Sequence, residues 1–140
     1  MGNNPSIQKI SFEDVQYILK NHESHLLINT LNDSEQECLI PYTISALNEE
    51  KTINEYLQKH FKNIKIIIYG KNANDEKIYK KYNQLTSLGF YNVYLYCGGL
   101  FEWLLLQDIY GTIEFPTTKK ELDILKYKPN RILNMSLLEY

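Results

Sequence analysis

The chain has 140 residues, of which 44% are apolar and 23% are charged, a composition typical of one soluble globular domain. Its formal net charge is −2, so it lacks the basic excess of nucleic-acid-binding proteins, and we expect no nucleic-acid partner. No apolar run approaches the roughly 20 residues that span a membrane, and the polar segment 1–11 does not resemble a secretory signal.

Short apolar runs alternate with segments of helical periodicity along the chain, which is typical of an α/β fold with a parallel sheet. We expect strands or short extended pieces at 7–10, 26–31, 38–40, 43–45, 64–69 and 92–96. We expect a helix after Ser11, further helices over 48–61, 76–88 and 100–110, and a last helix between Thr118 and Pro129.

Individual residues support several of these boundaries. Asp14 follows Ser11 at the spacing of a capping box, which predicts a helix start. Gly89 stands where the helix 76–88 should end, and Pro41 prevents a continuous central strand in its neighbourhood. These features predict a three-layer α/β domain with a mostly parallel five-stranded sheet and helices on both faces.

Four segments carry a resemblance to a known family. They are the strand, loop and helix of 64–88, the run Leu88-Gly89-Phe90-Tyr91-Asn92-Val93-Tyr94, the run Gly98-Gly99-Leu100-Phe101-Glu102-Trp103, and the strand 26–29 with Ile40-Pro41 after it. With these segments the chain resembles the rhodanese-like family, most specifically over residues 88–103.

The resemblance covers residues 7–115 and implies a rhodanese-like domain there. Residues 116–140 lie outside it, and Thr118 with Glu121 forms a second capping box, so we expect a helical C-terminal extension packed on the same domain. The arginine-poor, asparagine- and isoleucine-rich composition is also similar to that of rhodanese-like proteins of large DNA viruses.

In this family the residue directly after the strand 64–69 is a nucleophilic cysteine, and the resemblance aligns that position with Gly70. Backbone N–H groups in a loop that enters a helix favour an anion, such as a persulfide or a phosphate. Gly70 has no side chain to carry sulfur, and the nearby carboxylates of Asp75 and Glu76 oppose an anionic substrate. The resemblance therefore implies a family member without the catalytic cysteine.

Two further positions depart from the family pattern. Asn29-Thr30-Leu31 stands where the family often has Asp-Val-Arg. The phosphatase branch of the fold binds phosphate with a cysteine and an arginine in one loop, but the only arginine here is Arg131. We therefore expect no catalytic residues at the family's usual places.

The loop after the strand 64–69 is the candidate binding site, as a vestige of the family's active site. Its rim is expected near 29–31 and 97–100, because ligands gather at the carboxyl ends of parallel strands. Its backbone amides could bind an anion without catalysing a reaction. The alternative is a solvated loop that binds no ligand. The loop consists of Gly70, Lys71, Asn72, Ala73, Asn74, Asp75 and Glu76.

The two cysteines offer an alternative chemistry. Cys97 ends a predicted strand and Cys38 precedes Ile40-Pro41, so either thiol is a candidate for a relocated sulfur acceptor. The competing interpretation is that both are small buried core residues. Two cysteines are too few for a disulfide framework, which fits a reducing compartment, and we expect a cytoplasmic protein. If the protein is viral, we expect it in the host cytoplasm or in the virion.

Other candidate sites receive weaker support from the sequence. The three histidines His22, His25 and His60 do not have the spacing of convergent metal ligands, and we expect neither a metal nor a cofactor. The start Met1-Gly2-Asn3-Asn4-Pro5-Ser6 matches the myristoylation pattern at Gly2, and membrane association is expected only if Gly2 is acylated.

These observations favour a catalytically inactive rhodanese-like module that binds a protein partner or a second copy of itself. One candidate surface is an exposed aromatic patch of Phe90, Tyr91, Tyr94 and Tyr96. The alternatives are a sulfurtransferase that uses Cys97 or Cys38, and a myristoylated structural protein of a membrane or virion.

Overall fold

The computed structural model describes residues 6–133. Its strands are β1 (Gln8–Ile10), β2 (His25–Asn29), β3 (Thr43–Ile44), β4 (Lys65–Tyr69) and β5 (Val93–Tyr96). Its α-helices are α1 (Phe12–Lys20), α2 (Ala46–Gln58), α3 (Lys77–Ser87) and α4 (Gly99–Tyr110). Single 3₁₀ turns are η1 (His22–Ser24), η2 (Asp33–Glu35) and η3 (Ile124–Tyr127).

The five described strands form one sheet in the order β1-β5-β4-β2-β3, and every neighbouring pair is parallel. The central strand β4 pairs with β2 along its whole length, from Lys65 beside His25 to Tyr69 beside Asn29. After the exposed Lys65, β4 is a continuous apolar run from Ile66 to Tyr69, as expected for a parallel strand that is covered on both faces. The predicted fold class is confirmed.

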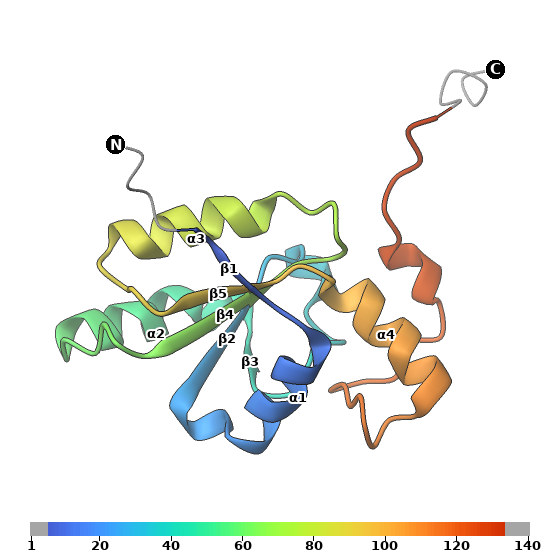
Figure 1. The fold of residues 1–140 in the computed structure, drawn as a ribbon, viewed down its shortest axis with the longest axis horizontal. Helices are drawn as coiled ribbons and strands as arrows, with labels where there is room; N and C mark the ends of the chain where they lie inside the picture. The colour runs from blue at the N-terminus through green and yellow to red at the C-terminus, as the bar shows by residue number, and fades with distance from the viewer. Residues whose placement is uncertain (1–5, 134–140) are drawn as a thin grey trace.

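Two helical layers cover the two faces of the sheet (Figure 1). Helices α1 and α4 pack on one face, where Ile67 and Tyr69 of β4 join their core with Trp103 of α4. Helices α2 and α3 pack on the other face, where Ile66 and Ile68 contribute instead. This alternation is the two-residue period of a strand, and it explains why every residue of Ile66–Tyr69 is buried.

The predicted start of α1 and end of α3 are confirmed by their hydrogen bonds and backbone angles. The Ser11 N–H donates to Asp14 Oδ2 at 2.9 Å, and the Asp14 N–H donates back to Ser11 Oγ at 3.5 Å, which completes the capping box. Gly89 follows α3 with φ +104°, a conformation that residues with a side chain rarely adopt.

The predicted helix between Thr118 and Pro129 is wrong, and η3 is the only helical turn in this part of the described chain. The side chain of Thr118 does not cap a helix, because it bonds to a distant segment. Its hydroxyl donates to the Glu37 carbonyl oxygen at 2.6 Å and accepts from the Leu39 N–H at 3.0 Å. These contacts hold the irregular segment after α4, which consists of turns and bends, against residues 37–39.

The predicted aromatic patch is also wrong. Phe90 and Tyr96 are each 1% exposed and belong to the two cores, whereas Tyr91 is 69% exposed. Tyr94 is half-buried against the α1–α4 core. Tyr94 and Tyr96, two residues apart on β5, share the face under α1 and α4, whereas Phe90 before the strand joins the α2–α3 core. These rings therefore do not gather on one exposed surface.

Gly99 lets the start of α4 lie against the loop that follows β4. Its φ is +71°, and a Cβ there would lie 2.8 Å from the Gly70 carbonyl oxygen and 2.9 Å from the Asn72 nitrogen. The Leu100 and Phe101 N–H groups donate to the carbonyl oxygens of Gly70 and Lys71, both at 2.9 Å. The N–H groups in the first turn of a helix have no partner within the helix, and here they bind the loop and hold it in place.

We expect Gly99→Ala to lower the free energy of unfolding by about 3 to 4 kcal/mol, since it combines an unfavourable φ with a clash against backbone atoms. Gly111→Ala is the matched control, because Gly111 has φ +99° but no atom within 4 Å of the position that a Cβ would take. We expect the control to lose about 1 to 2 kcal/mol. Urea unfolding measures both, and equal losses would contradict the close approach.

Candidate functional site

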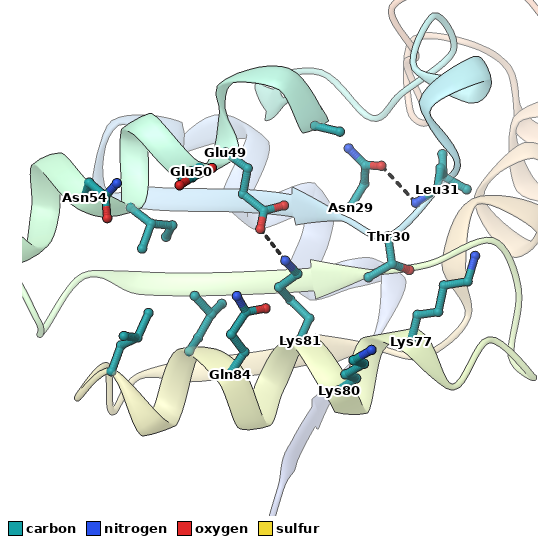
Figure 2. Close-up of a pocket in the computed structure, with 14 residues that line it drawn as sticks. Asn29, Thr30, Leu31, Glu49, Glu50, Asn54, Lys77, Lys80, Lys81 and Gln84 are labelled. Carbon is teal, nitrogen blue, oxygen red and sulfur yellow. Dashed lines mark hydrogen bonds and ion pairs between the residues drawn. The ribbon is translucent and has the colours of Figure 1, made fainter.

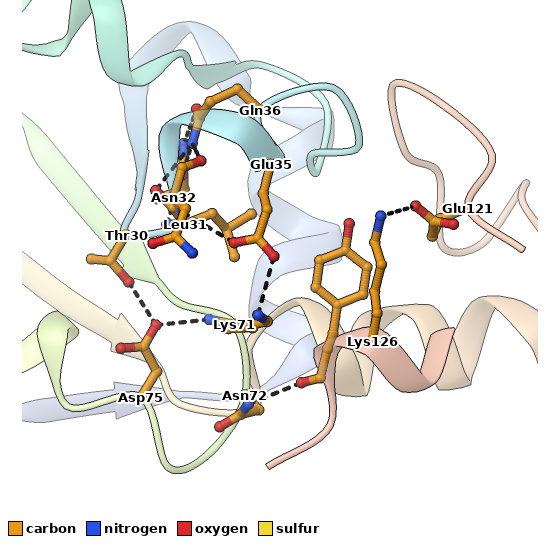
Figure 3. A network of polar contacts seen from close by, with 12 residues as sticks. Thr30, Leu31, Asn32, Glu35, Gln36, Lys71, Asn72, Asp75, Glu121 and Lys126 are labelled. Carbon is orange, nitrogen blue, oxygen red and sulfur yellow. Dashed lines mark hydrogen bonds and ion pairs between the residues drawn. The ribbon is translucent and has the colours of Figure 1, made fainter. Parts of the chain in front are cut away.

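The loop of residues 70–76 connects β4 to α3 at the carboxyl end of the sheet (Figure 3). Gly70 follows β4 directly, where the family resemblance places it. A Cβ at Gly70 would lie 2.8 Å from Asp75 Cγ and 2.9 Å from Thr30 Oγ1, and it would overlap Asp75 Oδ2. The space for a side chain at position 70 is therefore filled by the Asp75 carboxylate.

The Asp75 carboxylate accepts three hydrogen bonds from separate parts of the chain. Its Oδ2 accepts from Thr30 Oγ1 and from the Lys71 N–H, both at 3.0 Å. Its Oδ1 accepts from the Lys77 N–H at 3.0 Å, at the first residue of α3. These two backbone amides are the donors that would hold an external anion, and an internal carboxylate already satisfies them.

Asn72 is buried and fixes the shape of the loop. Its Nδ2 donates to the Tyr127 carbonyl oxygen at 2.9 Å, and its Oδ1 accepts from the Asn74 N–H at 2.9 Å. Its own carbonyl oxygen accepts from the Asp75 N–H at 3.1 Å. The loop is thus not freely solvated, because Asn72 joins it to the C-terminal segment. Ala73, Asn74 and Glu76 are exposed, and Asn74 lines the cleft beside the loop.

The rim at the end of β2 is held by an amide pair. Asn29 is 3% exposed, and its side-chain amide exchanges two hydrogen bonds with Gln36, at 2.8 and 3.0 Å. Gln36 Oε1 also accepts from the Ala46 N–H at 3.0 Å, at the start of α2. The position that the family resemblance aligns with an acid thus has a structural role here. Gln36 cannot be recognised as a site residue from the sequence, since no local pattern indicates its partner.

A cleft of about 450 Å³ opens beside the loop, between η2 and the C-terminal segment. Lys71 is half-buried and pairs with Glu35, with 3.1 Å between Nζ and Oε2. We call this space the lysine cleft, because its charged lining residues are Lys71, Lys77, Lys126 and Lys128, with Glu35 and Asp75. Of these lysines only Lys71 belongs to the predicted loop, and Lys126 and Lys128 lie far from it in the chain.

A larger groove of about 880 Å³ separates α2 from α3 (Figure 2). An ion pair between Glu49 of α2 and Lys81 of α3 crosses it. Thr30, Leu31 and Lys77 line both this groove and the lysine cleft, so the two hollows meet at the end of β2. Acidic side chains of α2 line one wall of the groove and lysines of α3 line the other. The groove therefore has no excess of one sign of charge that would select an anionic or a cationic ligand.

Neither cysteine lines the lysine cleft or the groove between α2 and α3 in the described structure. Cys38 is 4% exposed and its Sγ donates to the Lys119 carbonyl oxygen at 3.2 Å; burial is the main cause that raises the pKa of its thiol. Cys97 is half-buried against the α2–α3 core, with its Sγ 4.0 Å from the Tyr79 hydroxyl.

Two of the three histidines make defined structural contacts. His22 stacks on Tyr42 with 3.7 Å between ring centroids, and His25 Nδ1 lies 2.9 Å from the Asn21 carbonyl oxygen. Within residues 6–133, no three His, Cys, Asp or Glu side chains come together in an arrangement that could hold a metal ion. In the same range, none of the helices combines the length and the apolar character needed to cross a membrane. Gly2 lies outside the described residues.

The Asp75 hydrogen bonds generate a stability prediction. We expect Asp75→Ala to lower the free energy of unfolding by about 2 to 3 kcal/mol, since it removes three bonds to a charged acceptor and leaves two loop amides without it. Asp108→Ala is the control, because Asp108 is exposed on α4, and we expect a change within about 0.5 kcal/mol. Urea unfolding compares them, and an equally small loss at Asp75 would refute the role of its carboxylate.

The burial of Cys38 generates a prediction about its reactivity. A raised pKa means a smaller thiolate fraction at any pH below it, so we expect slow alkylation of Cys38 by iodoacetamide in the folded protein. Cys97, which is less buried, should be labelled first. Peptide mass spectrometry measures both rates, with the urea-unfolded chain as control. Labelling of Cys38 as fast in the folded as in the unfolded chain would contradict the burial.

Comparison with known proteins supports the fold. The rhodanese-like domain family model matches residues 14–106. No curated protein sequence gives a significant match. The crystal structure of the BH2092 protein from Bacillus halodurans is similar, with TM-score 0.59 and 21% identity over 94% of this chain and 88% of that chain. The Alr3790 protein from Anabaena sp. gives TM-score 0.58 and 21% identity, over 84% of this chain and 86% of that chain.

A thiosulfate sulfurtransferase from Pseudomonas aeruginosa also shares the fold, with TM-score 0.55 and 19% identity. The alignment covers 71% of this chain but only 19% of that enzyme. At such identities the structural likeness concerns the fold alone. The family match, in contrast, spans more than half of the chain, from α1 into α4. The chain belongs to the rhodanese-like domain family.

Proposed function

We propose that this protein is a catalytically inactive rhodanese-like module that acts by binding a protein partner. The family resemblance aligns the nucleophilic cysteine with Gly70, which has no sulfur. Asn29 and Leu31 stand where the family often has an acid and an arginine, and Arg131 is the only arginine of the chain. These absences remove the groups that would attack a substrate or bind its oxygens.

The observation that carries the proposal is the position of the Asp75 carboxylate. It fills the space of a side chain at position 70 and accepts from the Lys71 and Lys77 amides. A thiolate, a persulfide and thiosulfate are all anions. Each would be repelled by the Asp75 carboxylate, which occupies the place where the family binds its reacting anion. The loop amides therefore bind the carboxylate of Asp75 instead of a reacting sulfur anion.

The surroundings of the two cysteines support inactivity rather than a relocated nucleophile. Cys38 is buried under the segment after α4, where its Sγ donates to a carbonyl oxygen and its pKa is raised. Cys97 packs against the core beneath α3. Neither sulfur lines the lysine cleft, so neither has access to backbone amides of the loop that would stabilise a persulfide.

Both cysteines are free, which fits the reducing cytoplasmic compartment that the proposal assumes. The viral origin is a further part of the proposal that rests on composition alone. Acylation of Gly2 would add membrane or virion association to the same module. Intact mass measured on protein from its native host tests this last point directly, because a myristoyl group adds a defined mass.

The first test of inactivity uses the unmodified chain. We expect no thiocyanate from thiosulfate and cyanide, and no persulfide on Cys38 or Cys97 by mass spectrometry after incubation with thiosulfate. A thiosulfate sulfurtransferase measured in parallel controls the assay. Turnover, or a stable persulfide on either cysteine, would replace the inactive module with an enzyme that uses a relocated thiol.

A pair of variants tests the role of Asp75 in the loss of chemistry. We expect Gly70→Cys alone to remain inactive, since the new thiol meets the Asp75 carboxylate. The double variant Gly70→Cys, Asp75→Ala removes that charge and frees the loop amides. Its thiolate should then attack the outer sulfur of thiosulfate, release sulfite and leave a persulfide on residue 70. A persulfide on the single variant would show that the carboxylate does not block the site.

A further inference from the structure

Four lysine side chains from three separate segments line the lysine cleft. Lys71 comes from the β4–α3 loop, Lys77 from the start of α3, and Lys126 and Lys128 from the C-terminal segment. The last two lie beyond residue 106, where the family match ends, so this wall is not part of the shared domain. Figure 3 shows Lys71 next to Glu35 and Lys126 next to Glu121.

The four lysines differ in how far their charge is already compensated. Lys71 pairs with Glu35 at 3.1 Å, and Lys126 pairs with Glu121 at 2.5 Å. Lys77 and Lys128 are exposed, and no carboxylate within residues 6–133 lies within ion-pair distance of either. The Lys77 ammonium group donates to the neutral Asn32 Oδ1 at 3.3 Å. The cleft therefore keeps two positive charges for an external partner.

A single small anion does not fit this arrangement. The one position in the described loop where backbone amides converge holds the Asp75 carboxylate. The remaining positive charge sits on flexible side chains along two walls of a space of about 450 Å³. Such a space matches several carboxylates along one extended chain better than it matches one compact ion.

We infer that the lysine cleft binds a carboxylate-rich peptide segment of a partner protein, with Lys77 and Lys128 as the main contacts. This inference rests on the proposed function and names the class of partner for the same module. Electrostatic attraction by exposed lysines such as these mainly raises the association rate and favours partners of negative charge. Ile132 is 76% exposed and lines the same space, so an apolar side chain next to the acids gains a contact.

The observations favour a peptide over a nucleic acid. Glu35 and Asp75 line the same cleft, and the whole chain has a net charge of −2, so a continuous phosphate backbone meets repulsion. Within the described residues, no aromatic side chain lines the cleft, whereas single-stranded nucleic acids bind largely by stacking on such rings.

The test measures fluorescence anisotropy of fluorescein-labelled octaglutamate with the full chain, at about 50 mM and about 150 mM salt. We expect saturable binding that weakens with salt, and no binding of labelled octaglutamine. The variant Lys77→Glu, Lys128→Glu should weaken binding at least about tenfold. Glu is favourable at the first residue of a helix, so α3 should be retained in this variant.

A matched control separates the cleft from the overall charge. The variant Lys9→Glu, Lys51→Glu changes the net charge equally, but both positions are exposed and outside the cleft. We expect it to weaken binding by less than about twofold. Neutral replacements, Lys77→Gln with Lys128→Gln, provide a second test if the charge reversal prevents folding, as judged by urea unfolding.

Three outcomes overturn the inference. Octaglutamate fails to bind, the two charge-reversal variants weaken binding equally, or labelled octathymidylate binds as tightly as octaglutamate. The sulfurtransferase assay on the same preparation decides the proposed function separately. A chain that is inactive and does not bind octaglutamate remains an inactive module with a different partner, whereas an active chain contradicts the proposed function itself.

Discussion

The carboxylate of Asp75 joins three parts of the chain where they meet at the carboxyl end of the sheet. Its donors belong to Thr30 after β2, to the first loop residue after Gly70, and to the first residue of α3. Bonds to a charged acceptor contribute about 1.5 to 3 kcal/mol each in typical cases, less where solvent reaches them. Together with the buried Asn72, this side chain determines the shape of the loop.

The contacts of α4 depend in turn on that loop. The carbonyl oxygens of Gly70 and Lys71 accept the first free N–H groups of the helix, and Gly99 allows the close approach. Trp103, on the next turn, is fully buried and donates from Nε1 to the Pro116 carbonyl oxygen at 2.8 Å. A chain of contacts thus runs from the loop through α4 to the segment that follows it.

That segment returns to the loop from the other side. Tyr127 of η3 is 1% exposed, and its carbonyl oxygen accepts from the Asn72 side chain. Thr118 bonds to residues 37 and 39 on the way. The chain beyond the family match therefore forms a wall of the lysine cleft, so the surface at the sheet's end differs from what the family domain alone would present.

The sequence was sufficient for the elements that local rules determine. The apolar runs of β2, β4 and β5 and the capping box of Ser11 are each recognisable within a few residues, and the family resemblance supplied their arrangement. The site was accessible only in part. The sequence indicated that Asp75 opposes an anion. Its hydrogen-bond partner Thr30 is 45 residues away, so the sequence did not show that the Asp75 side chain points toward Gly70 and Thr30.

Long-range contacts also explain the main errors. Thr118 and Glu121 have the spacing of a capping box, but the Thr118 hydroxyl bonds to the Glu37 carbonyl oxygen, 81 residues away. The rings of the expected aromatic patch are divided between two cores, because Tyr94 and Tyr96 of β5 face α1 and α4 whereas Phe90 packs under α2 and α3. In both cases the local pattern was present and distant parts of the chain decided the outcome.

The place of β1 in the sheet has a consequence for how the chain reaches this structure during synthesis. β1 is the first described strand to leave the ribosome, but its only described neighbour is β5, with Gln8 beside Tyr94 and Ile10 beside Tyr96. The intervening strands can pair with one another earlier, whereas the hydrogen bonds of β1 cannot all form until residue 96 has emerged. Such a distant pairing is slow to form, so the nascent protein carries an unprotected edge on β5 that chaperones or neighbouring chains can reach.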